Sequence, residues 1–374
     1  MPETPPPPPR RRGCLFTVVL FSLGFSLLGN LVLAILVIRF AAGGLDLDHS
    51  SLQEQYVLGD RAADDKIAVV KVDGVISETG IAHPIKQLEA AAKDKHVKGV
   101  VLRVDSPGGT VTASDELYHS IVNLRDDTNR RFKSTGKKPV VVSMGAVAAS
   151  GGYYIAVAGS PILAERTTIT GSIGVFAALP NVAKLAENNG VKLELIKAGA
   201  MKASGSFFHD LSQQERQTWQ DTVDGAYDTF LKVIETGRPK LTRQKLVEDL
   251  VINRQVPERD DKGNDVLRDG KKVMVDYKRV RADGATFTAQ QAKEFDLIDE
   301  IGDLPAAVKI AAQKANLSSY RAVTFAKPPT LLDALTGAQA AQGGLEARLG
   351  SALTPRLWYL APTADGAILS TPKP

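Results

Sequence analysis

The strongest constraint on the fold is a regular alternation of apolar runs and helical stretches between residues 66 and 143. Apolar runs at 66–73, 97–104 and 140–143 are typical of buried strands, and the stretches 82–95 and 111–134 suit helices. Strands that alternate with helices indicate βαβ units and a parallel sheet. Sites in such α/β proteins form where the carboxyl ends of the strands meet. The sequence therefore predicts an α/β fold with a site at that edge.

Two glycine-rich turns follow these strands. Asp105-Ser-Pro-Gly-Gly109 ends the second strand, and Ser150 follows the third, with Gly151 and Gly152 directly behind it. A serine at a strand-to-helix turn can present its hydroxyl to a cleft while the next backbone N–H stays free to bind a developing negative charge. Taken alone, Ala-Ser-Gly-Gly is more often a tight turn that permits close packing. The hypothesis of a nucleophilic serine therefore depends on the rest of the chain.

A serine nucleophile needs a base beside it, and no pattern in this chain nominates a His–Asp pair. Lys202 lies in the turn 199–204, where its neighbours are uncharged and mostly small. Such neighbours would allow the amine to be buried, and burial disfavours the charged form of a lysine. Ser172, between Gly171 and Ile173, is a candidate hydrogen-bond partner of the lysine. Lys197 is the competing candidate for the base.

A long uncharged segment near the N-terminus predicts a membrane span. No residue from Gly13 to Ile38 is charged, and a helix needs about 20 residues to cross a bilayer. The apolar core of a cleaved signal peptide is shorter, about 7–15 residues. A retained anchor is therefore favoured. The small residues 41–44 could still contain a signal-peptide cleavage site, so a cleaved segment stays the alternative. The three arginines at 10–12 predict a cytoplasmic N-terminus and a catalytic domain on the extracytoplasmic side of the membrane.

The chain is expected to divide into five parts. They are a Pro/Arg-rich head (1–12), a transmembrane helix (13–40), a linker (41–65), a catalytic domain (66–318, with an exposed insertion at 257–283) and a C-terminal tail (319–374).

Further elements are predicted within the catalytic domain. The segments 167–176 and 193–196 are interpreted as strands. Ser212 and Glu215 have capping-box spacing at the start of a long helix that ends near residue 236, and Thr288 opens a second such helix.

Composition limits the classes of partner and cofactor. The net charge is only +4, and no basic run is interleaved with aromatic residues, so nucleic-acid binding has little support. The single cysteine, Cys14, excludes an intramolecular disulfide and a cysteine-rich metal site. The five histidines lack ligand spacing. Neither a metal nor an organic cofactor is predicted.

The order of these motifs resembles the signal peptide peptidases of the SppA type, over roughly residues 66–310. The segments that carry the resemblance are Asp105-Ser-Pro-Gly-Gly109, 143–154 around Ser150, Thr170-Gly-Ser-Ile-Gly-Val175, Lys197-Ala-Gly-Ala-Met-Lys202 and 287–300. The family has a long form with two tandem copies and a short form with both catalytic residues in one copy. This chain is similar to the short form.

The resemblance implies a serine endopeptidase with a Ser–Lys dyad on a ClpP/crotonase-like fold of repeated ββα and βαβ units. It implies that Ser150 is the nucleophile, that Lys202 is the general base and that Ser172 orients the lysine. It also implies that the N–H groups of Gly109 and Gly151 form the oxyanion hole. Members of the family form membrane-tethered homo-oligomeric rings that act on signal peptides or other membrane-associated peptides.

The chain departs from the family pattern near the lysine, where Ala198, Ala203 and Phe207 replace the usual Ser, Asp and Pro. None of these replacements removes a candidate catalytic atom. They bear on substrate preference and on the shape of the binding groove more than on the catalytic reaction. Three other functions stay open. They are a crotonase-like acyl-CoA enzyme, a non-catalytic scaffold that uses the apolar segment 357–360, and a protease that cuts specific membrane-protein partners.

Overall fold

The computed structural model describes residues 13–41, 52–128, 132–326 and 357–360. The chain divides into two compact units, residues 1–51 and 52–374. The predicted head, 1–12, lies outside the described residues, as do residues 42–51 of the predicted linker.

The described part of the first unit is a single helix, α1 (Gly13–Ala41). Its segment Val18–Ile35 has a mean hydropathy of 2.3 and is long and apolar enough to cross a membrane. A signal sequence near the N-terminus has the same length and composition. The helix is thus a candidate span or signal sequence.

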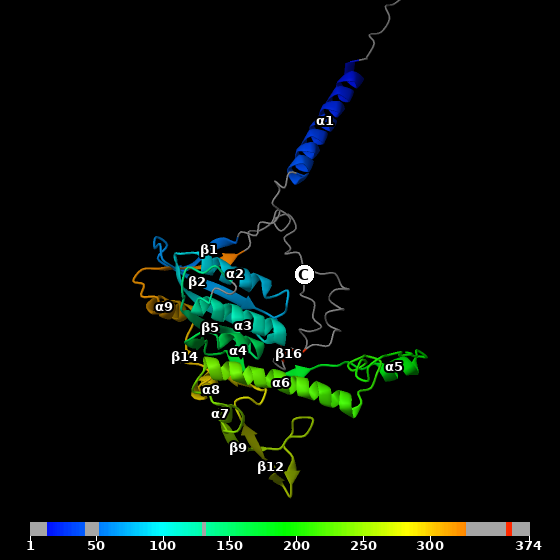
Figure 1. Ribbon diagram of the computed structural model, residues 1–374, viewed down its shortest axis with the longest axis vertical. Coiled ribbons are helices and arrows are strands. Elements are labelled where there is room, and N and C mark those ends of the chain that lie inside the picture. The colour runs from blue at the N-terminus through cyan, green and yellow to red at the C-terminus, as the bar shows by residue number, and fades with distance from the viewer. Residues whose placement is uncertain (1–12, 42–51, 129–131, 327–356, 361–374) are drawn as a thin grey trace, which may run out of the picture. The chain divides into compact units, whose positions relative to one another are not determined.

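The second unit is built on one mixed sheet (Figure 1). The strand order is β1 (Gln53–Gly59), β15 (Arg321–Ala326), β2 (Lys66–Asp73), β3 (Val97–Ser106), β5 (Val140–Ala149), β6 (Ile162–Ala164) and β14 (Glu300–Ile301). The pairs from β15 to β14 are parallel, and β1 is antiparallel to β15. The later half of β5 pairs with β7 (Ile169–Gly171), which pairs in turn with β13 (Thr286–Thr288).

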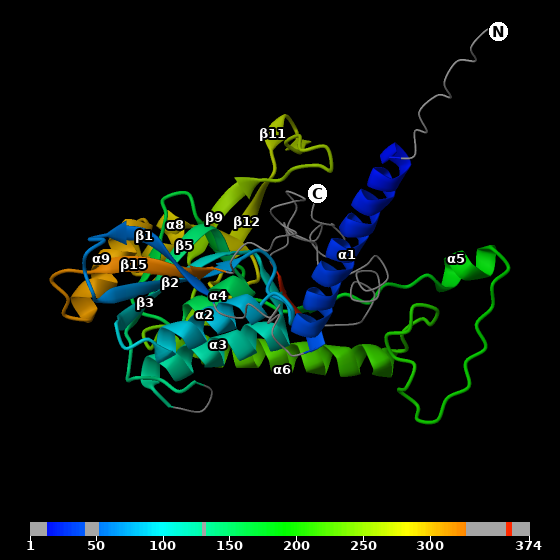
Figure 2. The same ribbon diagram turned by 90° about the horizontal axis from the view of Figure 1, so that it is seen from above.

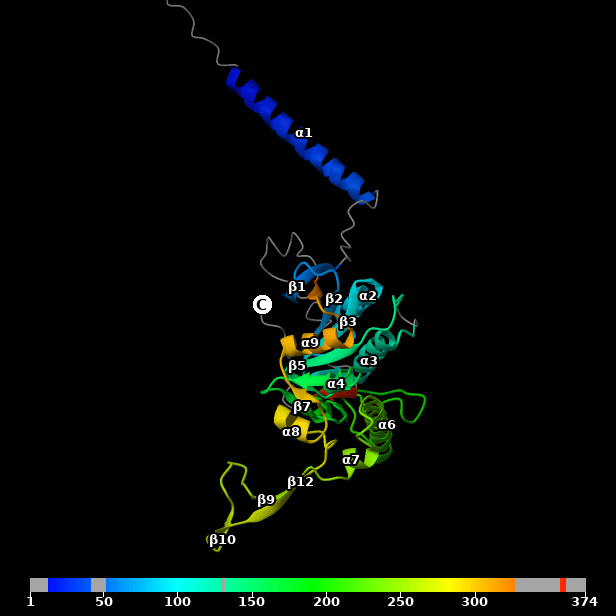
Figure 3. The same cartoon turned by 90° about the vertical axis from the view of Figure 1, so that its left-hand side faces the viewer.

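Helices cover both faces of the sheet (Figure 3). On one face lie α2 (Ala82–Lys93), α3 (Val111–Asp126) and α4 (Gly151–Ala156), and on the other lies α9 (Leu304–Lys314). Successive residues of β3 alternate between the two cores: Leu102 packs on the side of α3, and Val101 on the side of α9. Because both faces are buried, the strands are continuously apolar.

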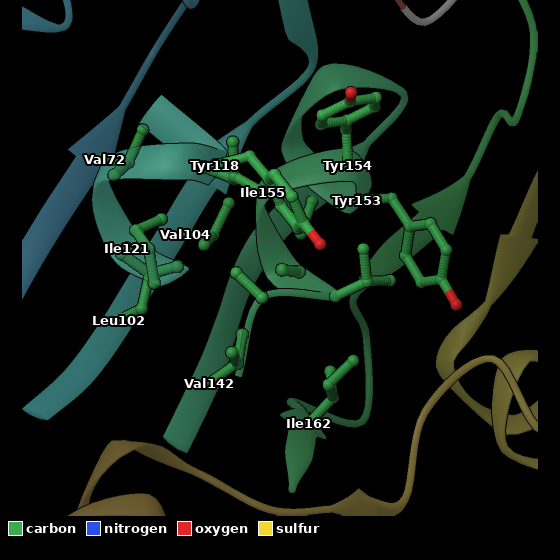
Figure 4. Close-up of a cluster of buried hydrophobic side chains, with 14 of the residues drawn as sticks. Val72, Leu102, Val104, Tyr118, Ile121, Val142, Tyr153, Tyr154, Ile155 and Ile162 are labelled. Atoms are coloured by element: carbon green, nitrogen blue, oxygen red, sulfur yellow. The ribbon is translucent and has the colours of Figure 1, made fainter. Parts of the chain in front are cut away.

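The larger core anchors α4, the helix that follows Ser150 (Figure 4). Tyr153 and Tyr154 are fully buried. The hydroxyl of Tyr153 donates to the carbonyl oxygen of Leu297 at 2.8 Å, and that of Tyr154 donates to Asp115 at 2.6 Å. Both hydroxyls thus have the partners that buried polar groups require. One bond thus ties α4 to the segment at Leu297, and the other ties it to α3.

The remaining elements complete the second unit (Figures 1 and 2). They are β4 (Gly108–Thr110), β8 (Phe176–Ala177), α5 (Ala183–Asn188), α6 (Gln213–Gly237), α7 (Arg243–Val247), β9 (Ile252–Pro257), β10 (Leu267–Arg268), β11 (Lys271–Lys272), β12 (Met274–Arg279), α8 (Ala289–Glu294) and β16 (Leu357–Leu360). The predicted insertion lies mostly in the antiparallel hairpin β9–β12, with β10 and β11 at its tip.

Both predicted capping boxes are present. The hydroxyl of Ser212 accepts the N–H of Glu215, and the Glu215 carboxylate accepts the N–H of Ser212. The equivalent pair opens α8 at Thr288. Helix α6 therefore begins where the sequence indicated, because its first N–H groups are satisfied locally.

The structure corrects several predicted elements. The expected linker contains β1, and the expected tail contains β15, which lies between β1 and β2 in the central sheet. The segment 167–176 is two short strands, β7 and β8, and 193–196 forms no strand. A strand exists only where a partner supplies hydrogen bonds, and these partners are distant in sequence.

Candidate active site

Ser150 lies on a sharp turn between β5 and α4. Its backbone has φ 54° and ψ −116°, a conformation that costs a non-glycine residue about 1–3 kcal/mol. Its N–H donates to the carbonyl oxygen of Gly171 at 2.8 Å, which fixes the turn against β7. The side chain is buried, and its Oγ has no hydrogen-bond partner among the described residues. A strained turn thus holds an unpaired serine hydroxyl at the carboxyl end of a central strand.

Gly109 and Gly151 lie in direct contact beside this serine. A Cβ atom placed on Gly151 would be 3.1 Å from the backbone nitrogen of Gly109. Gly151 is the first residue of α4, where backbone N–H groups lack partners within the helix. The two glycines predicted to form the oxyanion hole are therefore brought together.

A third residue from the sequence prediction, Ser172, is close to the same turn. It follows Gly171, has φ 51°, and is buried. Its hydroxyl donates to the carbonyl oxygen of Gly284 at 3.0 Å. Ser172 also lines a cleft of about 430 Å³ between the segment 173–176, α6 and residues 282–284. Its hydroxyl is thus engaged with the backbone and not with a lysine.

Lys202 is placed differently from the prediction. The sequence favoured a buried amine, but Lys202 is exposed in the single chain. Its turn is held against α6, because Trp219 Nε1 donates to the hydroxyl of Ser204 at 2.9 Å. The competing lysine, Lys197, is also exposed, and its Nζ donates to the carbonyl oxygen of Ala200. The isolated chain does not join either lysine to Ser150 by a hydrogen bond.

The arm that carries Lys202, residues 178–211, extends past one end of α6 (Figure 2). Many of its large apolar side chains are exposed. They are Leu185, Val191, Leu193, Leu195, Ile196, Met201 and Phe208, and Ile196 is 93% exposed. So many exposed large apolar side chains in one arm favour an interaction site.

Asp105 has a structural role that the sequence analysis did not assign. Its carboxylate accepts the N–H of Val147 at 3.1 Å and lies against Gly145, where a Cβ atom would be 2.9 Å from its Cγ. The ladder between β3 and β5 is irregular at this point. Asp105 therefore shapes the final residues of β5 that lead into Ser150. The only signal in the sequence was its position in the glycine-rich motif after β3.

Across the described ranges, no three His, Cys, Asp or Glu side chains are grouped so that they could hold a metal ion.

Comparisons with known proteins show the family of the chain. The family model for peptidase family S49 matches residues 132–255, which include Ser150 and Lys202. The chloroplastic serine protease SPPA of Arabidopsis thaliana is 31% identical over 76% of this chain. A candidate protease of Synechocystis sp. is 31% identical over 73% of this chain, and protease 4 of Salmonella typhi is 30% identical over 71%.

The coverage of these relatives differs. The chain spans 83% of the Synechocystis protein, but only 38% of the chloroplast enzyme and 37% of protease 4. A protein of Enterococcus faecium that is named as a candidate signal peptide peptidase SppA is 31% identical, and 62% of it is covered. These matches favour a hydrolase over an acyl-CoA enzyme or a scaffold. The chain belongs to peptidase family S49 and is a serine peptidase of the SppA type.

Proposed function

We propose that the chain is a membrane-anchored endopeptidase with a Ser150–Lys202 dyad on a ClpP/crotonase-like fold, acting on signal peptides or other membrane-associated peptides. The observation that carries the proposal is the unpaired hydroxyl of Ser150, held on a strained turn beside Gly109 and Gly151. A nucleophile needs this freedom, because a hydroxyl already engaged with the backbone has no proton to give to a base.

The proposed reaction proceeds through an acyl-enzyme. Neutral Lys202 takes the proton of Ser150 as Oγ bonds to the substrate carbonyl carbon, and the resulting oxyanion is bound by the N–H groups of Gly109 and Gly151. The C–N bond then breaks, and the ammonium of Lys202 protonates the leaving amine. Neutral Lys202 next removes a proton from water as the water oxygen bonds to the ester carbonyl carbon. The bond from that carbon to Oγ then breaks, and the ammonium of Lys202 gives its proton to Oγ, which restores Ser150 and neutral Lys202. Ser172 is proposed to orient the lysine.

This chemistry needs Lys202 to be removed from solvent, and we propose that assembly into a homo-oligomeric ring does this. The lysine lies in the same arm as the exposed apolar residues Leu193 and Ile196. A second copy that covers those side chains would also desolvate the neighbouring amine, which disfavours its charged form. Assembly would thereby create the base.

The proposed localisation follows from α1. A helix with no charged residue from Gly13 to Ile38 that is preceded by three arginines is expected to keep its N-terminus in the cytoplasm. The second unit, residues 52–374, would then act on the extracytoplasmic side. There it would meet peptides released into or beside the bilayer.

The test is substitution of the two proposed catalytic residues in the full chain. Ser150→Ala and Lys202→Ala are each expected to lower hydrolysis of an unstructured fluorogenic peptide by about a thousandfold or more. Ser120→Ala is the matched control for the serine, because Ser120 is also buried and its hydroxyl donates to the backbone carbonyl oxygen of Glu116 within α3. Lys197→Ala is the control for the lysine.

Full activity of Ser150→Ala would overturn the proposed function. Full activity of Lys202→Ala, with loss in Lys197→Ala, would move the base to the competing lysine. Comparison of the peptides that accumulate in cells with wild-type and Ser150→Ala protein then separates signal peptides from specific membrane-protein partners.

A further inference from the structure

The hairpin formed by β9 and β12 ends close to the candidate active site. It extends away from the central sheet (Figures 1 and 3), and the two strands at its tip, β10 and β11, are exposed. The last residue of β12, Arg279, is different, because it is buried, with a relative exposure of 9%. A charged side chain is almost never buried unless it is paired. The partners of Arg279 therefore show what this residue does.

Arg279 holds the turn 283–286, which follows β12. Its Nε and Nη2 donate to the two carboxylate oxygens of Asp283 at 2.7 and 2.9 Å. Its Nη1 donates to the carbonyl oxygen of Thr286 at 3.0 Å. The guanidinium also lies over the ring of Phe287, 4.0 Å from the ring centroid. One planar group that binds a carboxylate in a bidentate manner thus fixes both ends of the turn.

This turn supplies both backbone partners of Ser172. The Asp283 carboxylate also accepts the N–H of Ala285 at 3.0 Å. The carbonyl oxygen of Ala285 accepts the N–H of Ser172, and that of Gly284 accepts the hydroxyl proton of Ser172, both at 3.0 Å. A hydroxyl has only one proton to donate. The turn therefore leaves the hydroxyl of Ser172 with lone pairs alone, so that it can only accept a hydrogen bond from an amine.

The same turn leads into the strand beside the Ser150 backbone. Strand β13 pairs with β7, and its first residue, Thr286, lies opposite Gly171. The carbonyl oxygen of Gly171 accepts the N–H of Ser150. The ring of Phe287, which Arg279 covers, packs against Gly171, where a Cβ atom would be 2.8 Å from its Cδ2. The turns at Ser150 and at Ser172 are thus both in contact with backbone that Arg279 holds.

We propose that Arg279 is a positioning residue for the peptidase reaction. Through Asp283 and the turn 283–286 it fixes the hydroxyl of Ser172 as an acceptor. A neutral amine has two N–H groups and one lone pair, so an N–H of Lys202 that donates to Ser172 leaves the lone pair free to take the proton of the nucleophile. This inference rests on the proposed function, because it takes Lys202 as the base in the assembled enzyme.

The first test is Arg279→Met in the full chain, which removes the guanidinium and keeps an apolar side chain. The kcat for an unstructured fluorogenic peptide is expected to fall by about 10- to 100-fold with KM nearly unchanged, because the catalytic groups are misplaced while the substrate still binds. Arg279→Lys should lose almost as much, because lysine keeps the charge but cannot form the bidentate pair. Wild-type kcat in Arg279→Met would overturn the proposal.

Arg281→Met is the matched control. Arg281 is also partly buried, and its guanidinium donates to the carbonyl oxygens of Phe295 and Lys245, neither of which lies in the turn 283–286. This variant should keep the kcat of wild type. An equal loss of kcat in Arg281→Met would show that the removal of any such arginine impairs the enzyme, and it would contradict a specific role of Arg279.

A double variant separates positioning from stability. Arg279→Met leaves the carboxylate of Asp283 without its partner, so denaturant unfolding should show a loss of stability. Asp283→Asn in the same chain removes that charge and should recover part of the stability. The kcat should stay low, because the amide does not restore the bidentate pair. If kcat recovers together with stability, Arg279 only stabilises the chain and the proposal is wrong.

A further measurement does not depend on catalysis. In the Ser150→Ala background, the amide of Ser172 should exchange its hydrogen faster with Arg279→Met than with the native arginine. If exchange is faster but wild type hydrolyses no peptide, the proposed function fails while the support of Ser172 by Arg279 stands. If wild type is active and the exchange at Ser172 is unchanged by Arg279→Met, the positioning role is wrong and the peptidase assignment stands.

Discussion

Around Ser150, glycine is required where the backbones approach too closely for a side chain. A Cβ atom on Gly109 would lie 1.7 Å from the carbonyl oxygen of Ile76, and one on Gly152 would lie 2.6 Å from that of Ser106. Neither contact can be relieved without moving backbone. Gly151 is different, because its shortest contact, 2.5 Å, is with the side-chain oxygen of Ser114.

This difference predicts that a second substitution can restore part of the stability lost when Gly151 is replaced. Gly151→Ala is expected to destabilise the protein by about 1–3 kcal/mol through overpacking. Ser114→Ala in the same chain should recover part of that loss, because it removes the closest clashing atom. Ser114→Ala alone should be close to neutral, since the buried Ser114 hydroxyl has no hydrogen-bond partner among the described residues. Denaturant unfolding of the three variants measures this. A double variant no more stable than Gly151→Ala would contradict the steric explanation.

At the scale of elements, one ion cluster joins the start of β2 to its neighbours. Lys66 Nζ contacts Glu54 of β1 at 2.6 Å and Asp94 at 3.0 Å. Burial alone would lower the pKa of Lys66, but the two carboxylates outweigh it and raise that pKa. Burial alone would raise the pKa of Asp94, but the N–H of His96 and the charge of Lys66 hold it below its ordinary value.

The cluster predicts a pH-dependent contribution to stability. Because the pKa of Asp94 is lower in the folded state, its contribution is present above its ordinary value near 3.8 and is lost as the pH falls through the lower folded value. Asp94→Asn should cost about 1–2 kcal/mol at pH 7, and the difference from wild type should shrink as the pH approaches 3. Denaturant unfolding across this range measures it. A constant difference would show that the charge of Asp94 is not responsible.

The contribution of Lys66 has the opposite dependence. Its folded pKa is raised, so its contribution is complete below the ordinary value of 10.5 and is lost as the pH rises through the higher folded value.

At the scale of the whole molecule, the arm 178–211 is one of the described segments whose large apolar side chains a single chain leaves exposed. Residues 191–195 alternate apolar and polar side chains, which is typical of a strand with one buried face. The structure nevertheless leaves them without strand pairing, and Val191, Leu193 and Leu195 are exposed. A second copy of the chain would supply the missing partner.

This arrangement predicts linked losses of assembly and activity. Leu193→Glu with Ile196→Glu should shift the full chain in detergent to a smaller oligomer and lower peptidase activity at least about tenfold, because charges oppose burial of the arm. Lys192→Glu is the matched control, since it changes charge on the intervening polar side. Light scattering after size-exclusion chromatography, with the peptide assay, measures both effects. A dissociated variant with full activity would show that assembly does not activate Lys202.

The sequence predicted those features that depend on local spacing. The glycine-rich turns at Gly109 and Ser150, the two capping boxes and the parallel strands β2, β3 and β5 all follow from neighbouring residues or from the period of apolar side chains. Helix α3 ends earlier than its predicted limit of 134, because Asp127 adopts the left-handed conformation with φ 54°.

Features that depend on distant partners required the tertiary structure. Strand β15 exists because β1 and β2 lie on either side of it, and β16 because β4 and β8 do. The contact between Gly109 and Gly151 depends in the same way on two strands that adjoin only after folding. The amino-acid sequence alone nominated Ser150 and Lys202 as candidate catalytic residues. Only the tertiary structure decided that the hydroxyl of Ser150 is buried and unpaired, that Lys202 is exposed in the single chain, and that Tyr359 lies opposite Gly109. These three features depend on contacts between segments that are distant in sequence, and the local patterns around each residue do not specify such contacts.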